Sequence, residues 1–133
     1  VEACKLFMEN ICLNRDIVLK MELCEENPSV KMDTSLFEQV LINVIKNSAE
    51  SIEETGHILI RTSAEPLMLE VSDDGKGIAK EVEIKLFSPF FSTKPNGQGI
   101  GLIFIREVLM KHGCTFSLRT YEDGITRFRI CFP

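Results

Sequence analysis

One pair of asparagines and one glycine-rich segment carry residue types that could bind a phosphorylated ligand. Asn43 and Asn47 lie four residues apart in an apolar, helix-like stretch, so both fall on one helix face. An amide oxygen there suits Mg²⁺, which prefers oxygen ligands and bridges phosphates. The segment Gly97-Gln98-Gly99-Ile100-Gly101-Leu102 opens a helix, and free N–H groups at a helix N-terminus attract phosphate. Alone, each pattern is equally typical of a solvated face or a turn; together they point to phosphate chemistry.

A second glycine-rich segment, Asp73-Asp74-Gly75-Lys76-Gly77-Ile78, follows the apolar stretch Leu67–Val71. A carboxylate at the end of a strand could accept a hydrogen bond from the exocyclic amine of adenine. Guanine presents a carbonyl at that position, so a buried carboxylate would reject it. Gly75 and Gly77 have no Cβ and would let the backbone approach a base closely. This segment therefore predicts an adenine site.

The order of these segments resembles a known family. The helix with the two asparagines resembles the N box of GHKL nucleotide-binding proteins, and the segment from Asp73 to Ile78 resembles their first glycine box. The F box is matched by Phe87-Ser88-Pro89-Phe90-Phe91-Ser92-Thr93-Lys94, and the second glycine box is matched by the segment from Gly97 to Leu102. The closest resemblance is to the ATP-binding catalytic domain of sensor histidine kinases, and residues 89–94 point to the nitrogen-regulation type. It implies the Bergerat fold, a two-layer α/β sandwich with a mixed sheet and helices on one side, and it implies ATP and Mg²⁺ as cofactors.

The resemblance also implies a role for individual residues. Asn47 is expected to bind Mg²⁺, with Asn43 beside the phosphates or metal-bound water, while Lys94 reaches the terminal phosphates. Asp73 is expected to read adenine and Thr126 to help hold it. The other expected nucleotide-binding residues are Gly75, Gly77, Ile78, Gly97, Gly99, Ile100, Gly101 and Leu102.

Two positions depart from common patterns in related proteins. Hydrolytic relatives of the family carry a glutamate that activates water where this chain has Asn43. Asparagine cannot act as a general base, which favours phosphoryl transfer to another protein over hydrolysis. Asp74 stands where asparagine is commoner, and its role stays open.

Hydrophobic periodicity and turn residues predict the elements that position these side chains. Asp33 is the expected N-cap of a helix that runs to about Glu54 and stops at Thr55-Gly56. Its inward face is predicted to consist of Leu36, Phe37, Val40, Leu41, Val44, Ile45 and Ile52, with Gln39, Asn43, Asn47 and Glu50 on the other face. Further helices are expected over 1–13, 80–87 and 99–112, and strands over 17–23, 57–63, 67–73, 114–121 and 125–132. Residues 30–32 form a short extended piece, and residues 88–98 form a loop expected to close as a lid over nucleotide.

Composition and net charge limit the kinds of molecule that this chain is expected to bind. The 133 residues fit one domain, 1–133, and the net charge of -5 argues against nucleic acid and anionic membranes. No stretch reaches the ~18 apolar residues of a membrane span. Five cysteines without a C-x-x-C pair favour free thiols in a reducing compartment. We expect a cytoplasmic domain, which leaves open whether a parent protein is membrane-anchored.

The expected function follows from the resemblance. His57 and His112 lack the sequence context of a phosphoacceptor histidine, so the dimerisation and phosphoacceptor domain is expected to be absent from 1–133. The domain would bind ATP or ADP, phosphorylate a histidine on a separate dimerisation domain and, through it, serve a response regulator. Alternatives are an anti-sigma-factor serine kinase, an ATP-driven conformational clamp of the same superfamily, and a degenerate module without nucleotide.

Overall fold

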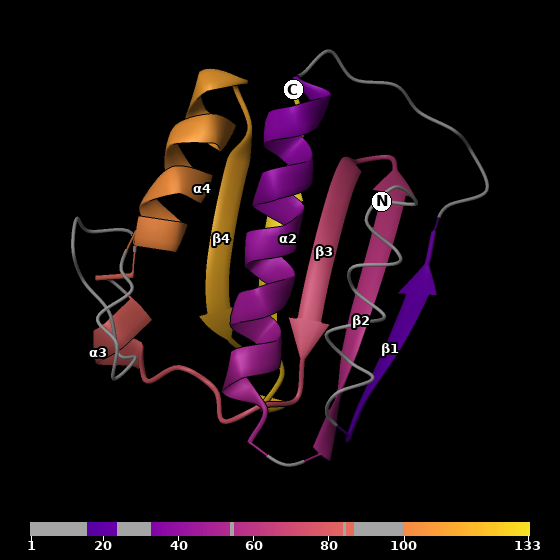
Figure 1. Ribbon diagram of the computed structural model, residues 1–133, viewed down its shortest axis with the longest axis vertical. Helices are drawn as coiled ribbons and strands as arrows, with labels where there is room; N and C mark the ends of the chain where they lie inside the picture. The colour runs from indigo at the N-terminus through magenta and orange to yellow at the C-terminus, as the bar shows by residue number, and fades with distance from the viewer. Residues whose placement is uncertain (1–15, 24–32, 54, 84, 87–99) are drawn as a thin grey trace.

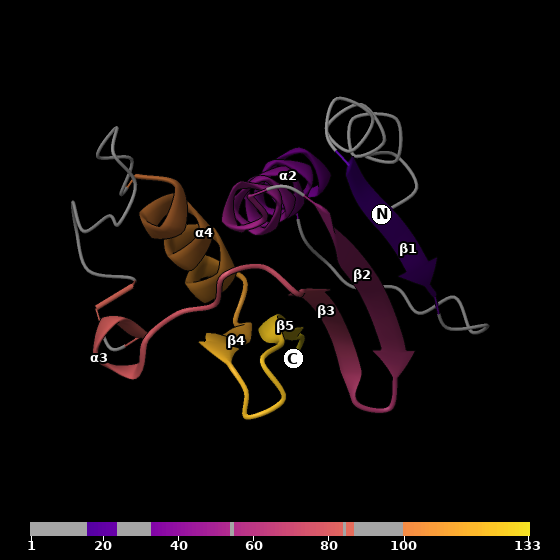
Figure 2. The same cartoon turned by 90° about the horizontal axis from the view of Figure 1, so that it is seen from below.

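The computed structural model describes residues 16–23, 33–53, 55–83, 85–86 and 100–133. Five strands form one sheet in the order β1-β2-β3-β5-β4; β1 runs parallel to β2 and the other neighbouring pairs are antiparallel. Helices α2 and α4 cover one face of this sheet, so the molecule has two layers (Figure 1 and Figure 2). The predicted α/β sandwich with a mixed sheet is confirmed. The elements are β1 (Asp16–Glu22), α2 (Thr34–Ser51), β2 (Thr55–Ala64), β3 (Leu67–Asp73), α3 (Lys80–Glu83), α4 (Ile100–Lys111), β4 (Thr115–Thr120) and β5 (Thr126–Cys131).

Helix α2 begins at the predicted cap. The Asp33 side chain, from an extended backbone at φ -71° and ψ 109°, accepts a hydrogen bond from the Leu36 N–H at 3.0 Å. The helix ends at Ser51, earlier than predicted, and Ile52 is its C-cap. Thr55 and Gly56 are the first residues of β2 and not a helix stop, because they pair with Asp16 and Ile17 of β1. Parallel pairing with β1 therefore explains why β2 begins at Thr55, which local propensity missed.

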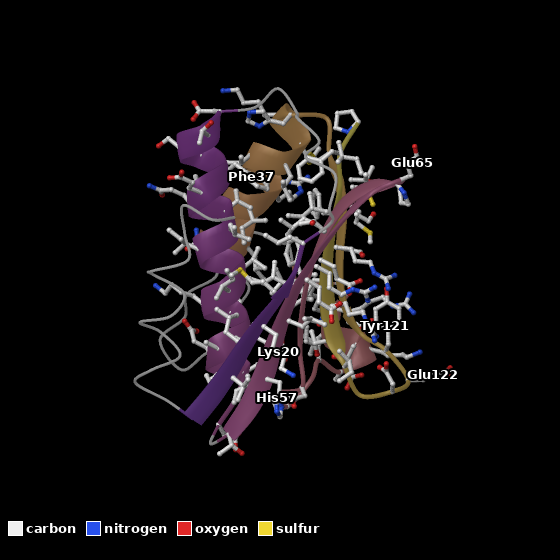
Figure 3. The ribbon with its side chains drawn as sticks, turned by 90° about the vertical axis from the view of Figure 1, so that its right-hand side faces the viewer. Lys20, Phe37, His57, Glu65, Tyr121 and Glu122 are labelled. Carbon is white, nitrogen blue, oxygen red and sulfur yellow. The ribbon has the colours of Figure 1, made fainter. Side chains whose placement is uncertain are left out.

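The core lies between the helices and the sheet. Val40, Leu41, Val44 and Ile45 of α2 are fully buried, as predicted. Phe37 points from the same helix toward the sheet (Figure 3), and its ring meets the ring of Phe132 edge-on at 5.7 Å. Each fully buried aliphatic side chain contributes roughly 1.5–3 kcal/mol to folding. This packing holds α2 against β3 and so fixes the position of its polar face.

Helix α4 ends in a Schellman motif. Gly113 has φ +74°, its N–H donates to Met110 O at 3.1 Å, and the Cys114 N–H donates to Leu109 O at 3.0 Å. Gly113 is therefore the C′ residue of α4. His112, just before it, lies between two helices: its Nε2 accepts from the Asp33 N–H at 3.2 Å and its Nδ1 lies 2.8 Å from Val108 O.

The other predicted boundaries agree with the observed ones to within two residues, except that α3 is a single turn over Lys80–Glu83. The helix over 1–13, the extended piece at 30–32 and the lid loop at 88–98 lie outside the described residues. Among the described helices, none has the length and hydropathy needed to cross a membrane. Cys114 and Cys131 are free thiols, as predicted.

Candidate functional site

The candidate site lies where the C-terminal ends of three elements meet. Strands β3 and β4 and helix α2 all end at the lower edge of the molecule, and the chain after β3 crosses this edge toward α3 (Figure 1). Asp73 is the last residue of β3, and it pairs across the sheet with Thr126, the first residue of β5. The fold thus places side by side two residues that are 53 positions apart and that were both expected at the adenine site.

Asp73 is almost completely buried, with 4% of its surface exposed. Its Oδ1 accepts hydrogen bonds from the Gly75 N–H at 3.0 Å and from Ser51 Oγ at 2.9 Å. Burial raises the pKa of this carboxyl, and the negative charge of Asp74 adds to the rise; the bonds from Gly75, Ser51 and Ser48 oppose it without cancelling it. Among the described residues no cation is paired with Asp73, and a buried carboxylate with a raised pKa is typical of a ligand-binding position.

The glycine segment after Asp73 packs against the end of α2. The Lys76 N–H donates to Ser51 O at 3.0 Å. A Cβ at Gly75 would lie 2.6 Å from that same carbonyl oxygen, closer than side-chain carbons approach. Gly77 adopts φ +79°, which favours glycine, and a Cβ there would lie 3.3 Å from the Thr120 side chain. Close approach to the Ser51 backbone therefore excludes a side chain at Gly75, and the positive φ disfavours one at Gly77.

A hydroxyl pair joins this segment to the β4–β5 hairpin. Thr120 and Thr126 face each other across the two strands, with their Oγ1 atoms 2.7 Å apart. The Ile78 N–H donates to Thr120 Oγ1 at 2.7 Å, and the Thr120 N–H donates to Glu83 Oε1 of α3 at 3.1 Å. Thr126 and Ile78, both expected near adenine, are connected through Thr120.

The two asparagines lie on the face of α2 that leads to Asp73. Asn43, Asn47 and Ser51 follow one another at intervals of four residues, so each lies about 6 Å further along the helix axis. Gln39 and Glu50 are exposed, as expected, whereas both asparagines are half-buried and the amide nitrogen of Asn47 is buried. A half-buried amide with an inward nitrogen fits a side chain that offers its oxygen to a metal.

The second glycine segment is described only in part. Ile100, Gly101 and Leu102 form the first turn of α4, and Leu102 packs against the core. Lys94, Gly97 and Gly99 lie outside the described residues. The segment expected to bind phosphate therefore leads into the N-terminus of a twelve-residue helix.

Asp74, whose role the sequence left open, binds the start of β2. Its Oδ1 accepts from the His57 N–H at 2.7 Å, and its Oδ2 lies 2.8 Å from His57 Nδ1. Partial burial raises the pKa of the Asp74 carboxyl, but the bonds from His57 outweigh this, and the pKa lies below its usual value. Asp74 therefore holds the start of β2 beside the site through His57, which Figure 3 labels.

Sequence reasoning missed Ser51, Thr120 and Glu83, which complete the polar network. A signal existed for Ser51, because it lies four residues after Asn47 and thus on the same helix face. A weaker one existed for Thr120, which the hairpin register around the Asp123-Gly124 turn sets opposite Thr126. Nothing in the sequence marks Glu83, since only the packing of α3 beside β4 brings it there.

Comparison with known proteins places this geometry in a family. Residues 32–133 match the family described as histidine kinase-, DNA gyrase B- and HSP90-like ATPases. The chain is 31% identical over 121 residues to the sensor histidine kinase ZraS of Escherichia coli, covering 90% of this chain and 26% of that protein. It is also 31% identical to the sensory histidine kinase/phosphatase NtrB of Rhodobacter capsulatus, over 80% of this chain and 34% of that one. The chain thus spans about a quarter to a third of these curated relatives.

A solved structure is similar over nearly its whole length. The catalytic domain of the histidine kinase ThkA, in a nucleotide-free form, superposes with a TM-score of 0.84 at 31% identity, over 99% of this chain and 88% of that domain. The resemblance read from the glycine segments is confirmed.

Proposed function

Because the chain belongs to the histidine kinase-, DNA gyrase B- and HSP90-like ATPase family and is a catalytic domain of the histidine kinase type, we propose that it binds Mg²⁺-ATP and transfers the γ-phosphoryl group to a histidine on a separate dimerisation domain. One observation carries the proposal: the α2 face with Asn43 and Asn47 leads through Ser51 to the buried carboxylate of Asp73. A nucleotide with its base at Asp73 would lay its phosphates beside the asparagines.

At the base end, the proposed roles follow from hydrogen-bonding chemistry. Asp73 accepts the exocyclic amine of adenine, and Thr126 supports the base from the neighbouring strand. Gly75 and Gly77 bring the backbone against the base, Ile78, Ile100 and Leu102 are proposed to line the adenine pocket, and Gly101 lies in the first turn of α4 toward the phosphates. Guanine would oppose its carbonyl oxygen to the Asp73 carboxylate, so adenine is preferred.

At the phosphate end, Asn47 would hold Mg²⁺ through its amide oxygen, with Asn43 one turn away. Mg²⁺ supplies charge neutralisation to the triphosphate when it is bound. Lys94, Gly97 and Gly99 are proposed to contact the terminal phosphates. Asn43 cannot take a proton from water, which favours transfer: the bond from the γ-phosphorus to the β,γ-bridging oxygen breaks, a bond to an imidazole nitrogen forms, and ADP leaves.

The acceptor histidine is proposed to lie outside residues 1–133, which form a single catalytic domain. His57 is bound to Asp74, and His112 links Asp33 to Val108 at the other end of α2. A response regulator is the proposed downstream partner; nucleic acid and membrane contacts are not proposed for this acidic segment. The free thiols Cys114 and Cys131 and the use of ATP support a cytoplasmic location.

Calorimetric titration with ATP, with and without Mg²⁺, tests the proposal. Mg²⁺ is expected to increase the ATP affinity of the wild type, and Asn47→Ala is expected to remove most of this increase. The affinity of the variant for Mg²⁺-ATP should be at least about tenfold lower, or roughly 1.4 kcal/mol. Gln39→Ala is the matched control, because it removes an exposed amide from the same helix face two turns away. If Asn47→Ala binds Mg²⁺-ATP as tightly as the wild type, the metal assignment is wrong, and if the wild type binds no ATP, the proposed function fails.

A further inference from the structure

Two hydroxyl side chains that were not expected in the site hold its adenine end together. We infer that Ser51 and Thr120 are positioning residues: Ser51 orients the Asp73 carboxylate, and Thr120 orients the Ile78 backbone and Thr126. The inference rests on the proposed function and deepens it, because it names what sets the geometry of the base-reading groups before nucleotide arrives.

Ser51 acts on Asp73 through two routes. Its Oγ lies 2.9 Å from Asp73 Oδ1 and 2.8 Å from Ser48 O, and the ionised carboxylate is the stronger acceptor of the single hydroxyl proton. Its carbonyl oxygen accepts from the Lys76 N–H at 3.0 Å and so holds the turn that supplies Gly75. With Oδ1 held by both Ser51 and Gly75, the carboxylate cannot rotate freely, and the direction of its second oxygen is set.

Thr120 acts on the opposite side of the turn. Its Oγ1 accepts from the Ile78 N–H at 2.7 Å and meets Thr126 Oγ1 at 2.7 Å. Its own N–H is bound by Glu83, so the residue is fixed from three directions. A valine at this position would keep the shape of the side chain and lose both hydroxyl contacts.

The groups around Asp73 make the Ser51 contact measurable by pH. The Asp73 carboxylate faces the hydroxyls of Ser48 and Ser51 from α2 and the side chain of Thr126 from β5. The neighbouring Asp74 carboxylate, which His57 binds, also acts on it. The hydroxyl of Ser51 lowers the pKa of Asp73 against the effect of burial. Since adenine needs the ionised form, loss of this hydroxyl moves the acid limb of nucleotide binding to higher pH.

The experiment is calorimetric titration of the 133-residue chain with ADP across roughly pH 5 to 8. Ser51→Ala is expected to weaken ADP binding by about three- to tenfold at neutral pH, the scale of one hydrogen bond, and to raise the pH at which affinity is half lost. Ser51→Thr keeps the hydroxyl and is expected to have the ADP affinity and the pH midpoint of the wild type. Ser72→Ala is the matched control: Ser72 is the neighbouring serine of β3, faces the other side of the sheet and bonds to Leu59 O at 3.4 Å.

Thr120 is tested in the same titration. Thr120→Val is expected to weaken ADP binding by about threefold or more without a shift of the pH midpoint, and Thr120→Ser is expected to recover the affinity. Thermal unfolding of each variant verifies that it is folded.

If Ser51→Ala leaves both affinity and pH midpoint unchanged, or lowers affinity equally at every pH, the positioning role of Ser51 is overturned. If Thr120→Val binds as well as the wild type, that of Thr120 is overturned. A wild type that does not bind ADP would instead overturn the proposed function.

Discussion

Strand β3 carries two buried carboxylates that the protein treats in opposite ways. Glu70 has 3% of its surface exposed and Asp73 has 4%. They are three residues apart in a strand, so they face opposite sides of the sheet. Asp73 faces the helices; its described hydrogen-bond donors are hydroxyl and N–H groups, and the negative charge of Asp74 also acts on it. Glu70 faces the open side and meets arginines: Arg129 Nε lies 2.6 Å from its Oε2, with Arg61 and Arg127 at 3.9 and 4.0 Å from its Oε1.

The arginines around Glu70 also surround an aromatic ring. The guanidinium carbons of Arg119, Arg127 and Arg129 lie 4.3, 4.8 and 4.9 Å from the centre of the Tyr121 ring. Tyr121 stands on the open face of the sheet, away from the helices (Figure 3). Arginine stems can cover apolar surface while their charged ends stay in water. The open face is thus covered by its own side chains, and the charge of Glu70 is neutralised within the chain.

The difference shows how burial alone fails to mark a functional carboxylate. Removing a charge from water is costly unless a partner compensates it. Glu70 is compensated by cations, which makes it part of the scaffold. Asp73 is buried with no cation paired to it in the described part of the chain, and its raised pKa reflects the cost of desolvation. Such a group gains from a ligand that supplies a donor, which is what the adenine amine would do.

The largest effect on stability is expected from Glu70→Gln. Loss of the charge leaves Arg129, Arg127 and Arg61 repelling one another, and we expect a loss of about 2 kcal/mol in the free energy of unfolding, the scale of a hydrogen bond to a charged group. ADP affinity should not change. Chemical denaturation measures the first and calorimetry the second. Glu22→Gln is the control, because the exposed Glu22 pairs with Arg61 at 3.6 Å and should contribute little. A loss no greater than that of the control would mean that the cluster is not a scaffold.

Asp73→Asn is expected to affect ADP binding, which Glu70→Gln should leave unchanged. ADP affinity is expected to fall by at least about 1 kcal/mol, roughly fivefold, because the amide offers a donor where adenine also has one. The raised pKa means that the native state holds the Asp73 proton more tightly than the unfolded chain, so wild-type stability falls as pH rises through the folded pKa. The variant lacks this loss, and its stability relative to wild type should increase from acid to neutral pH. Thermal unfolding against pH would contradict the assignment if the difference were constant.

The smallest effect is expected from Arg119→Ala. Arg119 stacks on Tyr121, but Arg127 and Arg129 flank the same ring, and no ion pair of Arg119 occurs within the described part of the chain. The unfolding free energy should drop by less than about 0.5 kcal/mol, with ADP affinity unchanged. A drop as large as that of Glu70→Gln, measured by the same denaturation, would show that Tyr121 and not Glu70 centres the cluster.

Much of the candidate site could be predicted from the sequence because its requirements are local. Gly77 adopts φ +79°, a local backbone conformation that favours glycine, and the Gly-x-Gly spacing of Gly75 and Gly77 is visible in the sequence. The asparagines recur at helical spacing on α2, and Asp33 and Gly113 cap helices through contacts within a few residues of each. These features depend on backbone geometry within a short segment, so residue order alone determines them.

The tertiary structure decided what depends on residues far apart in the chain. Parallel pairing with β1 made Thr55 and Gly56 part of β2, and the packing of α2 on β3 placed the Ser51 hydroxyl against Asp73. Asp73 and Glu70 are both acidic residues of one strand, and only the layer that each faces, helices or open side, distinguishes a binding group from a scaffold group. The reason is physical: hydrophobic pattern and turn chemistry act over a few residues, whereas desolvation and charge compensation depend on every group that folding brings near.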